Sequence, residues 1–134
     1  LGDVKMQVDY GASSVSQWIM TELLGSGDYD SYLKNLRVEL KARRDNALNA
    51  LEKNFKGIAT WMKPTGGFYI WLKFNKKIPI DKVFAKCRKN NVLFNPGNVY
   101  DYIENNAIRI SYAYARPEDL TKALKILADI VSKY

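Results

Sequence analysis

An apolar stripe with helical spacing runs through residues 29–55, and it constrains the fold of this chain more than any other feature. Its members are Tyr29, Leu33, Leu36, Leu40, Ala47, Leu51 and Phe55. Because they recur at intervals of three, four or seven residues, they share one face of a helix. We expect this helix to begin at Asp28 or Asp30, to end before Gly57, and to be roughly 40 Å long at about 1.5 Å per residue. A globule of 134 residues does not need so long a helix, so we expect it to lean on something outside this chain.

The hydrophobic pattern changes after residue 57 and indicates a small sheet with further helices. Strands are expected at 58–62, 68–74, 92–94 and 107–114, and helices at roughly 15–24, 79–89 and 117–131. Turn residues at 64–67 and 95–98 interrupt the strands, and residues 1–12 lack clear periodicity. Short connections favour antiparallel pairs with one crossover at the 79–89 helix. The expected fold class is α+β, an α/β sandwich in which helices cover a small, mostly antiparallel sheet and a long helix leads.

Composition excludes several kinds of site. The chain has no histidine, which removes imidazole as a general base and as a metal ligand. Its one cysteine, Cys87, excludes an internal disulfide and a cysteine-rich zinc site, and it lies on the apolar side of a predicted helix. We therefore expect no metal site and no cysteine nucleophile.

The ends and the charge of the chain bear on its origin and partners. The amino end is not a signal peptide and does not start with Met, and apolar runs are too short to span a bilayer. We expect a cytoplasmic fragment of a longer protein with no membrane partner. Lysine and arginine number 21 against 14 acidic residues, a net charge of +7 spread along the chain. An independent basic module that binds nucleic acid is therefore one open alternative.

Arg109 is the first candidate for a binding role. It lies inside a predicted strand, between Ile108 and Ile110, which point to the opposite face. A guanidinium on a central strand needs a fixed anion, because burying it unpaired is costly. The anion could be a ligand carboxylate, held by two hydrogen bonds, or an acidic side chain of this chain in an internal ion pair. If the strand instead lies at the sheet edge and faces water, the guanidinium needs no anion. The residue pattern leaves these alternatives open.

Three further motifs have distinctive backbone or charge properties. The turn Asn95-Pro96-Gly97 combines a fixed φ with room for close backbone approach, so it is either a ligand-facing turn or an ordinary one. Residues 64–68 carry paired glycines before an aromatic strand and read as a hairpin entry, since they lack the spacing of a phosphate loop. Arg44 falls close to the apolar stripe, which predicts a partly buried, paired guanidinium.

Taken in order, these segments resemble the carboxyl-terminal part of fold-type I aminotransferases, which use pyridoxal 5′-phosphate (PLP). The resemblance is strongest to MocR-type regulators, in which a GntR-type winged-helix domain is fused to an aminotransferase-like body. It covers nearly the whole chain and rests on residues 16–17, 27–30, 36–37, 43–45, 64–71, 95–97 and 107–113. Stand-alone aminotransferases acting on 2-aminoadipate, aromatic or similar amino acids are the second relative.

The resemblance implies a role for several residues. Residues 1–134 would be the small, carboxyl-terminal domain, which closes over a cofactor held by the large domain of the parent. Arg109 matches the arginine that grips the α-carboxylate of the amino acid. Pro96 and Gly97, with Asn95 beside them, match a turn that faces the active-site region, and residues 66–68 match the sheet entry of the small domain.

The same resemblance implies what this chain lacks. The Schiff-base lysine and most PLP ligands belong to the large domain, and no lysine here matches that lysine's motif. We expect PLP in the parent, no covalently bound cofactor and no catalytic residue in this fragment, and no transamination by the fragment alone.

The resemblance also implies partners: an amino-acid ligand, the parent's large domain, a second copy in a homodimer, and DNA through a winged-helix domain outside this chain. We favour an effector-sensing part of a regulator. A stand-alone aminotransferase, a nucleic-acid module and a purely structural domain with Arg109 in an ion pair are the alternatives. A winged helix upstream would distinguish regulator from enzyme, and the ligand itself is not identified by sequence.

Overall fold

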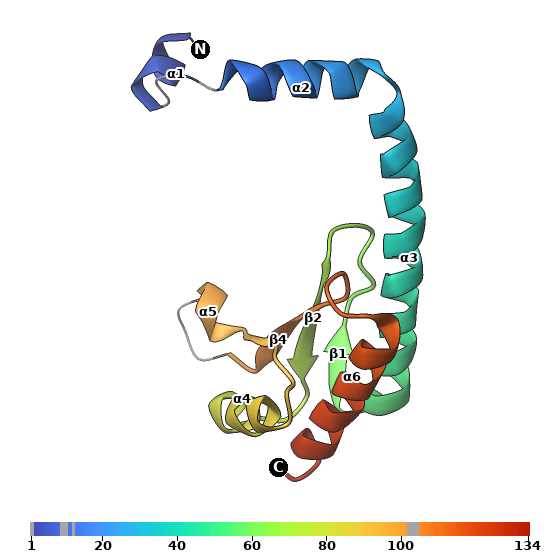
Figure 1. Cartoon of the computed structure of the whole chain (residues 1–134). Coiled ribbons are helices and arrows are strands. Elements are labelled where there is room, and N and C mark those ends of the chain that lie inside the picture. Colours follow the sequence, from blue (N-terminus) through green and yellow to red (C-terminus); the bar gives the residue numbers. More distant parts are fainter. Residues whose placement is uncertain (1, 9–10, 12, 102–104) are drawn as a thin grey trace. The chain divides into compact units, whose positions relative to one another are not determined.

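The computed structural model describes residues 2–8, 11, 13–101 and 105–134. Their helices and strands follow one another along the chain as Figure 1 shows: α1 (Gly2–Val8), α2 (Ser14–Gly25), α3 (Asp28–Phe55), β1 (Ala59–Trp61), β2 (Tyr69–Phe74), α4 (Ile80–Lys89), β3 (Asn95–Pro96), α5 (Asn98–Asp101), β4 (Ala107–Ser111) and α6 (Pro117–Val131). The chain divides into two compact units, residues 1–38 and 39–134, and each is described by itself.

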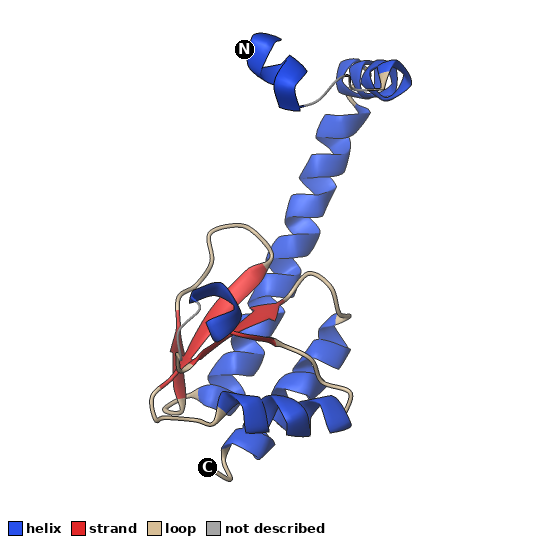
Figure 2. Cartoon of the chain, turned by 90° about the vertical axis from the view of Figure 1, so that its left-hand side faces the viewer, coloured by secondary structure: helices blue, strands red, loops and turns tan. Residues whose placement is uncertain are grey.

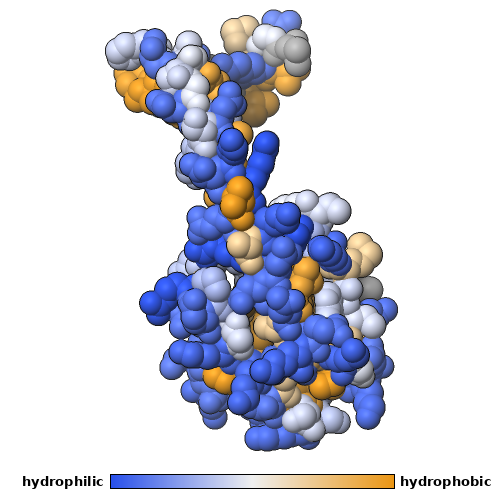
Figure 3. All heavy atoms as spheres, turned by 90° about the vertical axis from the view of Figure 1, so that its right-hand side faces the viewer, coloured by the Kyte–Doolittle hydropathy of each residue, from blue (hydrophilic) through white to orange (hydrophobic). Residues whose placement is uncertain are grey.

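The first unit consists of helical segments, and none of its described side chains is buried. Helix α2 begins where the sequence predicts, and the Ser13 hydroxyl accepts a hydrogen bond from the Ser16 backbone N–H. Its apolar side chains, Trp18 among them, are exposed, and orange side chains are visible over this part of the chain in Figure 3. Helix α1 was not expected, because a helix that buries nothing leaves no stripe to detect.

Helix α3 confirms the long helix expected from the apolar stripe, with the predicted bounds. Its buried residues lie only toward the carboxyl end, in the second unit, where Ala47, Leu51 and Phe55 enter the core. Gly57 follows with a positive φ of 77°, a conformation that ends a helix at little cost for glycine.

The second unit contains a four-stranded sheet in the order β1-β2-β4-β3. All three strand pairings are antiparallel, as expected. Since β2 and β3 both run antiparallel to β4, they are parallel to each other, and the chain between them passes through α4. This is the crossover that the sequence predicts, and the α+β fold class is confirmed.

One face of the sheet, the closed face, is covered by helices (Figure 2). Ile70, Leu72 and Phe74 alternate with exposed residues along β2 and are buried against α3, α4 and α6. Helix α6 adds Leu120, Leu124, Leu127 and Val131, the stripe expected from the sequence. We call the opposite surface the open face, and it carries Tyr69, Trp71, Lys73, Arg109 and Ser111.

The strand expected at 92–94 was wrong. The chain there has no strand, yet Val92 and Phe94 are buried, and the Phe94 ring packs edge-on against that of Phe84. Strand β3 instead covers Asn95–Pro96, where a break was expected. Pro96 is tolerated because β3 lies at the edge of the sheet, where a missing N–H leaves no neighbour unpaired.

Candidate functional site

Arg109 lies on β4, which has a strand on each side. It is paired in register with Trp71 of β2 and with Asn95 of β3. Its neighbours Ile108 and Ile110 are buried on the closed face, so alternation along the strand turns Arg109 to the open face. The edge-strand alternative for Arg109 is therefore wrong.

Two tyrosine rings, which we call the tyrosine pair, flank the guanidinium. The Arg109 Cζ atom lies 3.9 Å from the ring centroid of Tyr69 and 4.5 Å from that of Tyr100. Both distances are within the range of cation–π attraction. The Tyr100 ring also meets the Trp71 ring edge-on, with centroids 6.0 Å apart. Within the described residues, the arginine therefore lies against aromatic faces.

The Nε atom of Arg109 is buried and has no hydrogen-bond partner within the described part of the chain. Buried polar groups are nearly always paired, and one left unpaired costs free energy. No described carboxylate forms an ion pair with Arg109 either, so the internal ion pair expected as an alternative is not seen among the described residues. Nε itself is buried, so an external anion would bind at the two Nη nitrogens, which donate to no described residue.

The turn Asn95-Pro96-Gly97 lies beside Arg109, because Asn95 is paired with Arg109 in the sheet. A ligand-facing turn would need this position. The Gly97 N–H donates to the Ala107 carbonyl at 2.9 Å, and the Gly97 carbonyl accepts from the Tyr100 N–H at 3.0 Å. A Cβ atom at Gly97 would lie 2.1 Å from Asn105 Oδ1 and 2.8 Å from the Ala107 oxygen. Only glycine fits this close approach, which brings helix α5 and its Tyr100 alongside β4.

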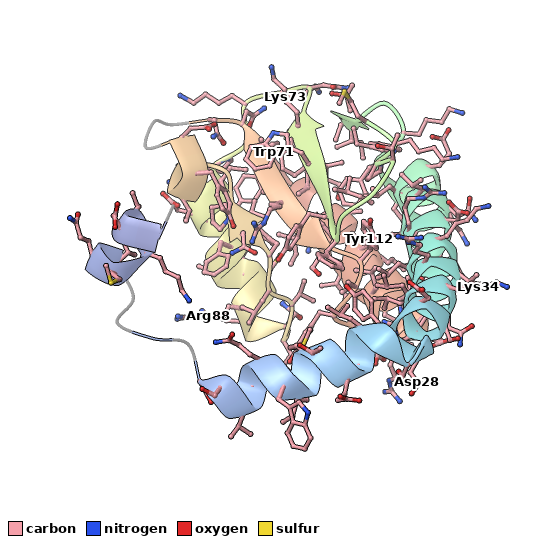
Figure 4. The ribbon with its side chains drawn as sticks, turned by 90° about the horizontal axis from the view of Figure 1, so that it is seen from above. Asp28, Lys34, Trp71, Lys73, Arg88 and Tyr112 are labelled. Carbon is pink, nitrogen blue, oxygen red and sulfur yellow. The ribbon has the colours of Figure 1, made fainter. Side chains whose placement is uncertain are left out.

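A pocket of about 650 Å³ lies on the open face at β1, β2 and the loop at 62–66. Trp61, Tyr69 and Trp71 supply aromatic surface, and Lys73 lines it as well. Figure 4 shows the side chains of Trp71 and Lys73 projecting from the same strand. Because Tyr69 contacts Arg109 and also lines this pocket, the pocket and the arginine adjoin each other.

Hydrogen bonds from α3 and from the residue after β4 hold the loop that leads into β2. The Tyr112 hydroxyl donates to the Gly67 carbonyl at 2.6 Å, and Arg44 Nη1 donates to the Pro64 carbonyl at 3.1 Å. Burial raises the pKa of the Tyr112 hydroxyl, with Arg44 opposing the rise, so the hydroxyl stays a donor at neutral pH. The hairpin entry expected at 64–68 is therefore a loop fixed to the core.

Two arginines of α3, Arg43 and Arg44, have structural partners. Arg44 donates from Nε and Nη2 to Asp45 Oδ1 at 2.9 and 2.7 Å, and this hydrogen bond holds the pKa of Asp45 below its ordinary value although desolvation opposes it. Arg43 Nη1 donates to the carbonyls of Ala113 and Ala115. The partly buried, paired guanidinium predicted at Arg44 is confirmed, and these residues join α3 to the loops beside the sheet.

Cys87 belongs to the core. Its side chain is fully buried in α4 next to Val83, and burial raises the pKa of its thiol. Among the residues the structure describes, no three side chains of histidine, cysteine or acid cluster as a metal site would need. No helix in the described ranges is both long enough and apolar enough to cross a bilayer.

Residues 3–127 match the sequence pattern of the family aminotransferase class I and II. The chain belongs to this family. Its matches also include regulators. It is 46% identical over 129 residues to the HTH-type transcriptional regulator YisV of Bacillus subtilis, covering 96% of this chain and 27% of YisV. It is 41% identical over 134 residues to the HTH-type transcriptional regulator NorG of Staphylococcus aureus, covering 99% of this chain and 30% of NorG.

A solved aminotransferase shares the fold. The structure of LysN, the α-aminoadipate aminotransferase of Thermus thermophilus complexed with N-(5′-phosphopyridoxyl)-L-leucine, superposes with a TM-score of 0.84 at 22% identity. The match covers 98% of this chain and 34% of that one. This chain therefore spans about a third of the aminotransferase and less than a third of the two regulators.

Sequence reasoning singled out Arg109 and the turn, which the structure places side by side, but missed the tyrosine pair. Tyr69 follows from strand alternation, because it shares the open face with Trp71. Tyr100 lies in a segment without hydrophobic periodicity, four residues after Pro96, so no local pattern connects it to Arg109. Only the packing of α5 beside β4 brings the ring to the guanidinium.

Proposed function

We propose that this chain is the amino-acid-binding part of an aminotransferase-like transcriptional regulator, in which Arg109 holds the carboxylate of the ligand. The observation that carries the proposal is the guanidinium of Arg109, which meets two aromatic rings but no described carboxylate. A carboxylate matches the planar fork of arginine and forms two charge-assisted hydrogen bonds with it. The regulators among the relatives favour a sensing role over turnover.

The rest of the parent protein completes this proposal. PLP, when bound there, supplies an electron sink next to the amino acid. The open face fits the substrate side of such a site, since it carries Arg109, which has no described anionic partner, and aromatic surface at Tyr69 and Trp71. In the proposal, this chain binds and orients the carboxylate and closes over the cofactor. The attachment lysine, the DNA-binding domain and much of a homodimer interface lie elsewhere in the parent.

Substituting Arg109 in the full-length natural protein tests the proposal. The protein is loaded with PLP, and its binding of the twenty standard amino acids is measured by calorimetry and by change in the visible absorption band. For a responding amino acid, Arg109→Lys should weaken binding by about ten- to a hundredfold, because lysine cannot form the bidentate pair. Arg116→Lys is the matched control, since Arg116 is exposed and pairs with Asp119.

The outcomes separate the proposal from its competitors. If Arg109→Lys lowers the melting temperature but leaves amino-acid affinity unchanged, Arg109 is structural and the proposal fails. If the PLP-loaded protein converts amino acids to oxo acids, the regulator part of the proposal gives way to an enzyme. Salt-dependent DNA binding by the 134 residues alone would instead support a basic nucleic-acid module.

A further inference from the structure

The guanidinium of Arg109 is more enclosed on some sides than on others. Its Nε atom is buried and has no hydrogen-bond partner among the described residues. The two Nη atoms also donate to no described residue, but neither of them is completely buried. The rings of Tyr69 and Tyr100 lie against the central carbon at 3.9 and 4.5 Å. An anion that uses the free donors therefore approaches at the Nη edge, past the tyrosine rings.

The tyrosine rings treat cations and anions differently. The face of an aromatic ring is the negative end of its quadrupole, which attracts the guanidinium and repels an anionic oxygen placed over it. Tyr69 and Tyr100 are 44% and 38% exposed, so neither ring is needed to fill the core. Both rings instead contact the guanidinium of Arg109.

Anions of different shape meet this arrangement differently. The two oxygens of a carboxylate lie in one plane with its carbon, so the whole group can lie in the plane of the guanidinium and accept from both Nη nitrogens. A sulfonate or phosphonate is tetrahedral and has a third oxygen outside that plane. Next to Arg109, the third oxygen would lie toward a tyrosine face.

We propose that Tyr69 and Tyr100 determine the anion specificity of this site, admitting planar carboxylates at the Nη edge of Arg109 and rejecting tetrahedral sulfonates and phosphonates. This inference rests on the proposed function, because it needs an anion at Arg109. The aromatic rings carry the effect and the hydroxyl groups do not. Phenylalanine in place of either tyrosine should therefore preserve the preference for carboxylates, and leucine should not.

Acetate and methanesulfonate are matched probes, because each carries one negative charge and one methyl group. Their affinities for the full-length natural protein, loaded with PLP, are measured from the broadening of the methyl proton signal on titration. We expect acetate to bind at least about tenfold more tightly than methanesulfonate, a discrimination typical of one misfitting group in a shaped site. Arg109→Lys should remove most binding of both, which identifies the signal with this site.

Variants of the tyrosine pair then test the cause. Tyr69→Leu and Tyr100→Leu should bring the acetate-to-methanesulfonate ratio toward one, and the double variant should do so most. Tyr69→Phe and Tyr100→Phe should keep the wild-type ratio. Tyr114→Leu is the matched control, because the Tyr114 side chain is 94% exposed. A merely structural role would change stability but leave this ratio unaltered.

Two different failures are distinguishable. If neither probe binds in a manner that depends on Arg109, the proposed carboxylate site fails and this inference with it. If Arg109 binds both probes equally, or if the leucine variants keep the wild-type ratio, the tyrosine pair does not set specificity while the carboxylate site stands.

Discussion

The two faces of the sheet differ in almost every property although the same strands form them. Along β2, Ile70 and Leu72 on the closed face are 1% and 0% exposed, whereas Tyr69 and Trp71 on the open face are 44% and 40% exposed. On β4, Arg109 faces the side opposite its buried neighbours. A strand therefore divides its residues between two tasks, because successive side chains point in opposite directions.

In the second unit, the closed face contributes most of the stability, and the open face carries the groups suited to binding. The closed face joins three helices into one apolar core, and removal of this surface from water is the main stabilising contribution. The side chains of the open face are only partly buried, so they contribute little to stability. They include aromatic rings, a lysine, and an arginine without a described hydrogen-bond partner. Substitutions on the closed face should consequently change stability, and those on the open face should change binding.

Adjacent residues on β2 provide the strongest test of this comparison. Leu72→Ala should lower the free energy of unfolding by about 2–5 kcal/mol, because it leaves a cavity in the core. Trp71→Ala on the open face should cost about 1 kcal/mol or less, although it deletes more atoms. Denaturant titration of the two variants measures both values. Equal losses would contradict the assignment of stability to the closed face.

Gly97→Ala should have the next largest effect, because it acts where the two faces meet at the sheet edge. The new methyl group would collide with the Ala107 carbonyl, a backbone atom that cannot move alone. We expect a loss of about 1–3 kcal/mol in unfolding free energy from this overpacking. Gly66→Ala is the matched control, since nothing lies within 4 Å of its added Cβ. If both variants have the same melting temperature, the close approach at Gly97 does not contribute to stability.

Tyr112→Phe should have the smallest effect on stability, and it tests a residue that contacts both the core and the loop beside the open face. The Tyr112 ring is buried on the core side, whereas its hydroxyl reaches the Gly67 carbonyl of the loop that leads into β2. Losing this hydrogen bond should cost about 0.5–1.5 kcal/mol. Tyr114→Phe, on an exposed side chain, should leave stability unchanged. Calorimetric melting of both variants checks the difference, and a silent Tyr112→Phe would mean that the hydroxyl does not hold the loop.

Much of the fold follows from the sequence because its elements bury periodic apolar faces. Helix α6 and the carboxyl half of α3 are examples, as is the alternation of β2. The strand expected at 92–94 failed because burial and strand pairing are separate events. Val92 and Phe94 enter the core without joining the sheet, and the less apolar Asn95 and Pro96 make the pairing.

The candidate site was predictable only in part. Arg109 is conspicuous as a charge between two isoleucines, and the turn at Asn95-Pro96-Gly97 is conspicuous by composition. The contact of Tyr100 with Arg109 joins helix α5 to strand β4, and no pattern in the sequence of either element predicts that contact. It depends on how closely Gly97 lets the backbone approach Asn105 and Ala107, which is a property of packing.

Local sequence patterns predict the long helix, the alternation that separates the closed face from the open face, the family, and the position of Arg109 opposite its isoleucine neighbours. Each of these depends on residues close together in the chain, where period and chemistry are readable. Tertiary structure alone decided the strand order, the edge position of β3 and the two rings around Arg109. These depend on contacts between distant segments, whose free energies come from the packing of complete surfaces and not from any one stretch of sequence.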